Sequence, residues 1–129
     1  MVLDVLLERD PHAEPAARLF AHVERQELTG LRGATTVTTV HYLSRKALGE
    51  AGARKQIEKL LRLFEVAAVT RAVLAGALGL RFRDFEDAVL HECARHAGAD
   101  GIVTRDPGGF GKAKLRVYEP VELLALDAL

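Results

Sequence analysis

The architecture of the chain follows most directly from residues 84–106, which read DFEDAVLHECARHAGADGIVTRD. Asp84 is a preferred N-cap residue, and the apolar spacing of residues 85–97 predicts a helix that a glycine ends. The short apolar run of residues 101–104 predicts a strand, and the Asp-Pro pair at Asp106 predicts a turn after it. This stretch therefore predicts a helix and a strand with acidic side chains at the start of the one and the end of the other.

In the rest of the chain, the spacing of apolar residues also alternates between that of helices and that of strands. Helices are predicted over residues 15–26, 35–48, 50–64, 70–78 and 121–126, and strands over residues 28–31, 64–69 and 115–118. Short strands separated by helices are typical of an α/β fold with a mostly parallel sheet. Ligands of such sheets bind beyond the carboxyl ends of the strands, so the residues after 103 are candidates for a functional site.

The composition is that of one folded domain covering residues 1–129, since 49% of the residues are hydrophobic and 28% are charged. No apolar run approaches the roughly 20 residues that cross a bilayer, and Asp4 and Glu8 interrupt the opening run. We therefore expect neither a membrane span nor a leader. The single cysteine excludes an internal disulfide and fits a reducing cytoplasm. The 18 basic and 18 acidic residues argue against nucleic-acid binding by bulk charge, but not against a local basic strip.

Acidic residues gather at the predicted helix start and strand end: Asp84, Glu86 and Asp87 open the helix, and Asp106 follows the strand. Because both ends lie at one edge of an α/β sheet, we expect Asp87 and Asp106 to face each other. Two close carboxylates repel unless a cation lies between them, and Mg²⁺ or Mn²⁺ prefers such oxygen ligands. A metal ion of this kind activates water for phosphodiester hydrolysis. The alternative is structural: Asp84 caps the helix, Glu86 and Asp87 interact with the helix dipole, and Asp106 begins a turn.

Basic residues lie beside this acidic group in the sequence. Arg81 and Arg83 precede the helix, and Arg105 stands directly before Asp106. They are candidates for contact with the phosphates of RNA, and the alternative is an ordinary solvated surface. Aromatic residues make up only 5% of the chain, which favours backbone contact over base stacking.

Two stretches, Phe85-Glu86-Asp87-Ala88-Val89 and Ala99-Asp100-Gly101-Ile102-Val103-Thr104-Arg105-Asp106 followed by Phe110, resemble the second half of a PIN domain. That family shows an Asp-Ala pair opening a helix and a strand ending in Thr-x-Asp with a Phe soon after. The order of elements over residues 35–78 is similar too. The resemblance implies a PIN-like three-layer α/β sandwich with a mostly parallel central sheet.

The resemblance also implies a function, because PIN domains are typically metal-dependent ribonucleases and include the toxins of bacterial toxin–antitoxin pairs. Asp87 and Asp106 match two of the metal-binding, catalytic carboxylates of the family, and Asp84 is a weaker match for a catalytic helper. Thr104 matches the strand-end hydroxyl and joins Arg81, Arg83 and Arg105 as a candidate for substrate binding. The chain is then expected to be a cytoplasmic endoribonuclease that uses Mg²⁺ or Mn²⁺, forms a homodimer and is held by a small antitoxin.

The start of the chain departs from the family. PIN domains usually begin with a strand that ends in Asp-Thr-Asn or Asp-x-Asn, whereas residues 1–9, MVLDVLLER, resemble the helix after that motif. We therefore expect the first strand to be missing from this sequence and encoded upstream of Met1, and Asp4 not to be the absent carboxylate. The alternative is that residues 2–7 form a strand, take the central place in the sheet and bring Asp4 towards the acidic edge.

The middle of the chain departs from the family as well, because Thr39 stands where PIN domains have a Glu in the helix after the second strand. Without the opening Asp and this Glu, metal binding and cleavage are expected to be weak. The alternative function is therefore a catalytically weak PIN-like module that binds RNA or a protein partner. A phosphate- or nucleotide-binding α/β protein ranks lower, since no Gly-rich phosphate motif is present.

A possible zinc site is suggested by the segment His91-Glu92-Cys93-Ala94-Arg95-His96, because His, Glu and Cys are residue types that bind zinc. Its histidines are five positions apart, which turns them about 140° from each other on a helix, and no third ligand accompanies them. We predict instead that Cys93 is a small core residue and that His91 and His96 lie on the surface. His41 is expected to be a surface or partly buried residue for the same reason.

Overall fold

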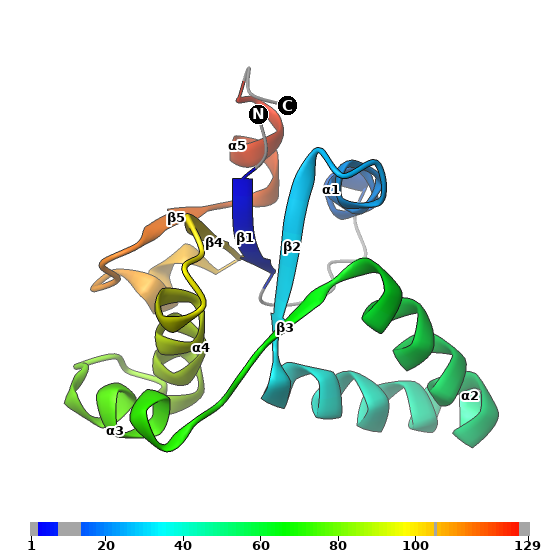
Figure 1. Cartoon of the computed structure of the whole chain (residues 1–129), viewed down its shortest axis with the longest axis horizontal. Coiled ribbons are helices and arrows are strands. Elements are labelled where there is room, and N and C mark those ends of the chain that lie inside the picture. Colours follow the sequence, from blue (N-terminus) through cyan, green and yellow to red (C-terminus); the bar gives the residue numbers. More distant parts are fainter. Residues whose placement is uncertain (1–2, 8–13, 105, 127–129) are drawn as a thin grey trace.

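The computed structural model describes residues 3–7, 14–104 and 106–126. Five strands form one sheet in the order β3-β2-β1-β4-β5, and every neighbouring pair is parallel (Figure 1). The strands are β1 (Leu3–Leu7), β2 (Leu28–Gly33), β3 (Glu65–Ala67), β4 (Gly101–Val103) and β5 (Arg116–Tyr118). The predicted parallel sheet is therefore confirmed, and helical crossovers connect its strands.

The helices are α1 (Glu14–Glu24), α2 (Ala34–Leu63), α3 (Arg71–Gly79), α4 (Phe85–His96) and α5 (Pro120–Leu124), with a 3₁₀ turn at Pro107–Phe110. Within α2, Gly49 has a φ of 79° that only glycine adopts easily, so α2 consists of two arms that meet at this residue. The prediction of two helices separated at Gly49 is confirmed. Figure 1 shows both arms extending away from the sheet. In the described part of the chain, no helix combines the length and apolar character that a bilayer crossing requires.

Helices cover both faces of the sheet, which makes three layers. Ile102 and Val103 are neighbours on β4 and point to opposite faces, and each belongs to a different hydrophobic core. The core around Ile102 contains Val73 of α3 and Val89 of α4. The core around Val103 contains Leu19 and Val23 of α1, Leu60 of the second arm of α2, Phe64 directly after α2, and Leu123 of α5. The sheet is thus shielded from water on both sides, as expected for a parallel sheet.

The start of the chain differs from the sequence-based expectation. We expected a helix there, with the first strand missing, but Leu3–Leu7 forms β1, which pairs with β2 and β4 in the centre of the sheet. A short apolar run has no decisive period, and two neighbouring strands supply the hydrogen-bond partners that favour the extended form. The helix expectation is wrong for these residues, and the alternative of a central strand is confirmed for them.

Asp4 lies at the wrong end of β1 to join the acidic group. It is in register with Thr29, whereas Leu7 at the carboxyl end of the strand is in register with Val103. Asp4 stands three positions before Leu7, a distance of about 10 Å along the strand. The backbone of Asp4 therefore lies before the strand end that borders the acidic group, and Glu8 and Asp10 lie outside the described residues.

Candidate functional site

Helix α4 begins at the edge of the sheet where β4 ends. Asp84 is its N-cap: the Oδ1 atom of Asp84 accepts a hydrogen bond of 2.8 Å from the backbone N–H of Glu86. The helix then buries every residue from Ala88 to Ala94 against the sheet and α3. Gly98, with a φ of 76°, reverses the chain so that β4 returns to the same edge. This geometry fixes the start of α4 and the end of β4 as neighbours.

Two carboxylates meet at this edge beside Gly109. A Cβ atom built on Gly109 would lie 2.8 Å from Oδ2 of Asp87 and 3.7 Å from Oδ2 of Asp106. The two oxygens are therefore no further apart than the sum of these distances. Asp87 is half-buried and Asp106 is exposed. The structure thus brings together the two acidic residues that the sequence singled out.

Thr104 orients the turn that carries Asp106. Its side chain is buried, and its Oγ1 accepts a hydrogen bond of 3.0 Å from the backbone N–H of Asp106. The carbonyl oxygen of Asp106 in turn accepts the N–H of Gly109 at 3.2 Å. The hydroxyl of Thr104 therefore positions a carboxylate, and its predicted contact with substrate remains a prediction. Asp84 uses one carboxylate oxygen for the cap, as the structural alternative required, and its catalytic role likewise remains a prediction.

A basic cleft of about 410 Å³ opens beside the acidic pair. Its lining residues come from the segment before α4 and from the loop after β4: Arg81, Phe82, Arg83, Gly108, Gly109, Gly111 and Lys112. Gly109 belongs to both features, so the cleft and the carboxylates are contiguous. The predicted residues Arg81 and Arg83 line this cleft, whereas Arg105 lies outside the described residues. Lys112 was not predicted, because it stands in a glycine-rich loop without helical or strand periodicity.

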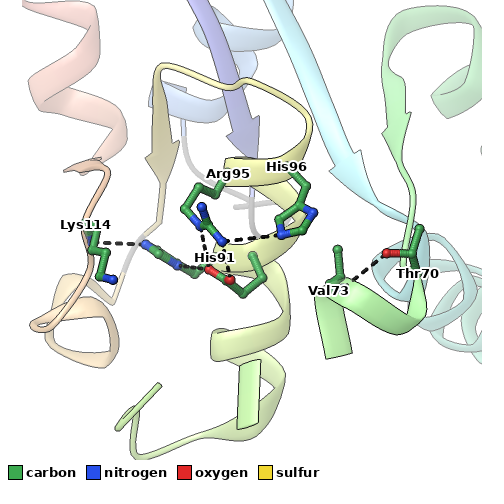
Figure 2. A network of polar contacts seen from close by, with 7 residues as sticks. Thr70, Val73, His91, Arg95, His96 and Lys114 are labelled. Carbon is green, nitrogen blue, oxygen red and sulfur yellow. Dashed lines mark hydrogen bonds and ion pairs between the residues drawn. The ribbon is translucent and has the colours of Figure 1, made fainter. Parts of the chain in front are cut away.

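A buried polar network supports the wall of the cleft (Figure 2). The Nε2 atom of His91 accepts a hydrogen bond of 3.0 Å from the backbone N–H of Lys114. Since that N–H can only donate, the ring proton is on Nδ1, which donates to Oε2 of Glu92 at 3.0 Å. Arg95 completes the network with hydrogen bonds of 2.9 and 3.1 Å to the two oxygens of Glu92.

This network corrects the expected surface position of His91, whose side chain is fully buried. His91 lies on the inner side of α4, and both of its ring nitrogens have partners there, so burial leaves no polar atom unpaired. His96 is exposed and His41 is partly buried, as predicted. Cys93 is a buried core residue, also as predicted, and burial raises the pKa of its thiol, which makes it a poor nucleophile.

The donor set fits a hard divalent cation better than zinc. Among the residues that the structure describes, no three His, Cys, Asp or Glu side chains are placed to share a metal. A zinc site needs such a set, whereas Mg²⁺ is often held by one or two carboxylates together with water. Asp87 and Asp106 supply two carboxylates in suitable proximity. The fit for Mg²⁺ or Mn²⁺ is therefore partial, with water or further residues needed to complete the coordination.

The fold and this edge define a class: a three-layer α/β domain with a carboxylate pair where its parallel strands end. A family model described as a PIN domain matches residues 1–107, and the chain belongs to the PIN domain family. The predicted family and the predicted three-layer fold are both confirmed. A comparison with curated proteins gives no match.

Solved structures share the fold at low sequence identity. VapBC2 from Rickettsia felis, bound to a DNA fragment from its promoter, has a TM-score of 0.69 and 13% identity, covering 91% of this chain and 98% of that one. DNA-bound VapBC from Salmonella typhimurium has a TM-score of 0.68 and 14% identity, covering 92% and 98%. PAE2754 from Pyrobaculum aerophilum has a TM-score of 0.61 and 24% identity, and both chains are covered completely. The similarity concerns architecture, because identities this low do not carry function.

Proposed function

We propose that this chain is a metal-dependent endoribonuclease that hydrolyses the phosphodiester bonds of RNA. The observation that carries the proposal is the convergence of the Asp87 and Asp106 carboxylates at Gly109. Asp87 is half-buried and Asp106 is exposed, and both lie where the parallel strands end. Their carboxylates therefore form an oxygen-rich site that is open to a substrate. Membership of the PIN domain family, whose members are typically metal-dependent nucleases, supports the same interpretation.

Each residue of the site has a defined task in this proposal. Asp87 and Asp106 hold Mg²⁺ or Mn²⁺, and the hydrogen bond from the Asp106 N–H to Thr104 fixes the direction of the second carboxylate. A divalent ion at this position supplies positive charge and lowers the pKa of bound water. Arg81 and Arg83 contact the phosphates of the strand from the adjoining cleft. Asp84 fixes the first turn of α4, and with it the position of Asp87.

The biological setting is proposed from the similar structures. They include VapBC2 from Rickettsia felis and a toxin–antitoxin complex from Klebsiella pneumoniae. By analogy we propose that this chain is a cytoplasmic toxin, that a small antitoxin holds it, and that it forms a homodimer. Large apolar side chains are exposed on α2 and α3 and are available for such contacts: Tyr42, Leu43, Leu48, Leu74 and Leu78.

A catalytically weak binding module is the second candidate, and specific residues favour it. Thr39 occupies the family's Glu position, and its hydroxyl donates a hydrogen bond of 3.2 Å to the backbone oxygen of Thr35. Leu7, not an Asp, stands at the carboxyl end of β1 beside Val103. Among the described residues, the end of β1 and position 39 thus carry no carboxylate, and each missing carboxylate lowers the affinity for a divalent ion because it removes negative charge.

Calorimetric titration with Mn²⁺ tests the metal site. We expect the chain to bind Mn²⁺ and Asp87→Asn to bind it at least tenfold more weakly, because the substitution removes a charged ligand while keeping its size. Glu58→Asn, at an exposed position on α2, is the control and is expected to leave binding unchanged. Equal affinity of the chain and Asp87→Asn removes Asp87 from the proposed site.

Cleavage of single-stranded RNA in the presence of Mn²⁺ then separates the two candidates. An endoribonuclease cuts internal bonds of an RNA blocked at both ends, and Asp106→Asn abolishes the cut. Binding of Mn²⁺ and RNA without any cleavage supports the weak binding module instead. Cleavage that survives Asp106→Asn contradicts the proposed site.

A further inference from the structure

Helix α4 approaches the loop after β4 at two positions one turn apart. Asp87 and His91 are four residues apart, so their side chains lie on the same face of the helix. The carboxylate of Asp87 lies beside Gly109, where an added Cβ atom would be 2.8 Å from its Oδ2 atom. The Nε2 atom of His91 accepts the backbone N–H of Lys114 at 3.0 Å (Figure 2). One helix face therefore carries both a proposed metal ligand and a hydrogen bond to the loop.

The loop carries the second carboxylate, Asp106, and needs an attachment to α4. Hydrogen bonds inside the loop, such as the one of 3.2 Å from the Gly109 N–H to the Asp106 carbonyl oxygen, shape it without joining it to the helix. Phe110 packs the loop into the core, but apolar contact has no preferred direction. The hydrogen bond from the Lys114 N–H to His91 has a defined length and direction, so it fixes where the loop lies on α4.

The neighbours of His91 select the form of the ring that accepts this bond. The ring accepts at Nε2 only when it is neutral and its proton is on Nδ1. That proton is donated to Oε2 of Glu92 at 3.0 Å, and hydrogen bonds from Arg95 lower the pKa of Glu92, so the group is a carboxylate that can only accept. A Cβ atom on Gly76 of α3 would lie 2.6 Å from Oε1 of Glu92, so α3 packs directly over this carboxylate and keeps it in place.

We propose that His91 is a positioning residue for the carboxylate pair. By accepting the Lys114 N–H it holds the loop on α4, and Asp106 consequently stays beside Asp87. His91 acts through the loop, because its ring nitrogens are both engaged away from the pair. The inference rests on the proposed function only in taking the two carboxylates as ligands of a divalent ion, which binds most tightly when both are held in place.

Two substitutions separate the hydrogen bond from the packing of the ring. His91→Leu keeps an apolar side chain against Phe82 but has no acceptor, whereas His91→Gln places an oxygen near the position of Nε2. In the metal-free chain we expect the amides of Lys114 and Gly109 to exchange with solvent at least fivefold faster in His91→Leu. His91→Gln should restore the protection of both amides. Thermal unfolding by circular dichroism checks that each variant is folded.

The nitrogen chemical shifts of the His91 ring test the tautomer without any substitution. In mildly alkaline buffer, where the ring is neutral, we expect a protonated Nδ1 and an unprotonated Nε2. A ring protonated at Nε2 cannot accept the Lys114 N–H and overturns the inference. This measurement applies even if His91→Leu does not fold.

Calorimetric titration with Mn²⁺ measures the effect on the carboxylate pair. We expect His91→Leu to bind Mn²⁺ at least fivefold more weakly than the original chain, and His91→Gln to bind it within twofold. Val23→Ala, in the core on the opposite face of the sheet, is the control for lost stability. It should lower the unfolding temperature and leave Mn²⁺ affinity unchanged. Equal losses of affinity in His91→Leu and Val23→Ala, or in His91→Leu and His91→Gln, overturn the inference.

The outcome is separable from that of the proposed function. If the original chain binds no Mn²⁺, but both loop amides lose protection in His91→Leu and recover it in His91→Gln, the positioning role stands and the proposed metal site is rejected. Unchanged protection of Gly109 in His91→Leu overturns the positioning role whether or not the chain binds metal. If the original chain binds Mn²⁺ and cuts RNA, and His91→Leu does both equally well, this inference alone is rejected.

Discussion

The Oδ2 atom of Asp87 lies 2.8 Å from the position that a Cβ atom would occupy on Gly109. Real Cβ atoms do not approach an oxygen so closely, so Gly109→Ala must displace something. The end of a short side chain moves more easily than the backbone, and we expect the Asp87 carboxylate to shift. Mn²⁺ affinity should then fall about tenfold, as measured by calorimetry, with little change in folding stability.

Gly108→Ala is the matched control for this prediction. A Cβ atom on Gly108 would lie 3.5 Å from Oδ1 of Asp106, which is ordinary van der Waals contact. We expect its Mn²⁺ affinity to stay within twofold of that of the original chain, a change of about 0.4 kcal/mol. Equal losses in both variants would show that loop composition matters and that the close approach of Gly109 to Asp87 does not.

A second prediction concerns the buried carboxylate of Glu92. Hydrogen bonds from Arg95 lower the pKa of Glu92, burial opposes this by raising it, and His91 lowers it further. Because the pKa in the folded state is below that of the unfolded chain, about 4.3, the ion pair stabilises the fold above that pH. That stability is lost as the pH falls through the lower, folded-state pKa.

Glu92→Gln tests this linkage. The variant should lose about 1–3 kcal/mol of unfolding free energy at pH 7, because Arg95 and His91 lose a charged acceptor. On acidification from pH 5 to pH 3 its stability should fall less than that of the original chain, so the two converge. Urea unfolding at a series of pH values measures both curves. Glu58→Gln, on the exposed surface of α2, should change stability by less than about 0.5 kcal/mol at every pH.

The sequence predicts local features of the fold well because they depend on neighbouring residues. The helix cap at Asp84 and the break at Gly49 are set by residues within one turn. The meeting of Asp87 and Asp106 was also predictable, since α4 and β4 are consecutive and share a sheet edge. Features that depend on distant partners were missed. The extended form of β1 is selected by pairing with β2 and β4, which its own mixed period does not encode.

The same reason explains the two residues of the site region that were misjudged or overlooked. His91 is buried because a backbone N–H from Lys114, in a loop after the next strand, satisfies its ring. The hydrophobic pattern of α4 does not predict that contact. Lys112 joins Arg81 and Arg83 only because the loop after β4 folds back towards the segment before α4. Both cases require knowledge of tertiary contacts.

A third prediction follows from the link between His91 and Lys114. His91→Ala removes the acceptor of the Lys114 N–H, along with a buried ring that packs on Phe82. The amide of Lys114 should then exchange with solvent at least tenfold faster, and stability should fall by about 2–4 kcal/mol from the lost packing and hydrogen bond. His96→Ala, at an exposed position on the same helix, should alter neither quantity appreciably. Unchanged protection of Lys114 in His91→Ala would show that the loop is held by other contacts.

A fourth prediction separates the two roles of Asp84, the cap of α4 and the proposed helper of the metal site. Asn caps helices about as well as Asp does, so Asp84→Asn should keep the hydrogen bond to the Glu86 N–H and lose at most several tenths of a kcal/mol from the helix dipole. Asp84→Ala should lose about 1 kcal/mol in urea unfolding, because the cap is gone. If the charge of Asp84 helps to hold the ion, both variants should bind Mn²⁺ about threefold more weakly, through lost long-range attraction. If Asp84→Asn binds Mn²⁺ as tightly as the original chain, the only supported role of Asp84 is to cap α4. Among the described residues, the acidic site would then consist of Asp87 and Asp106.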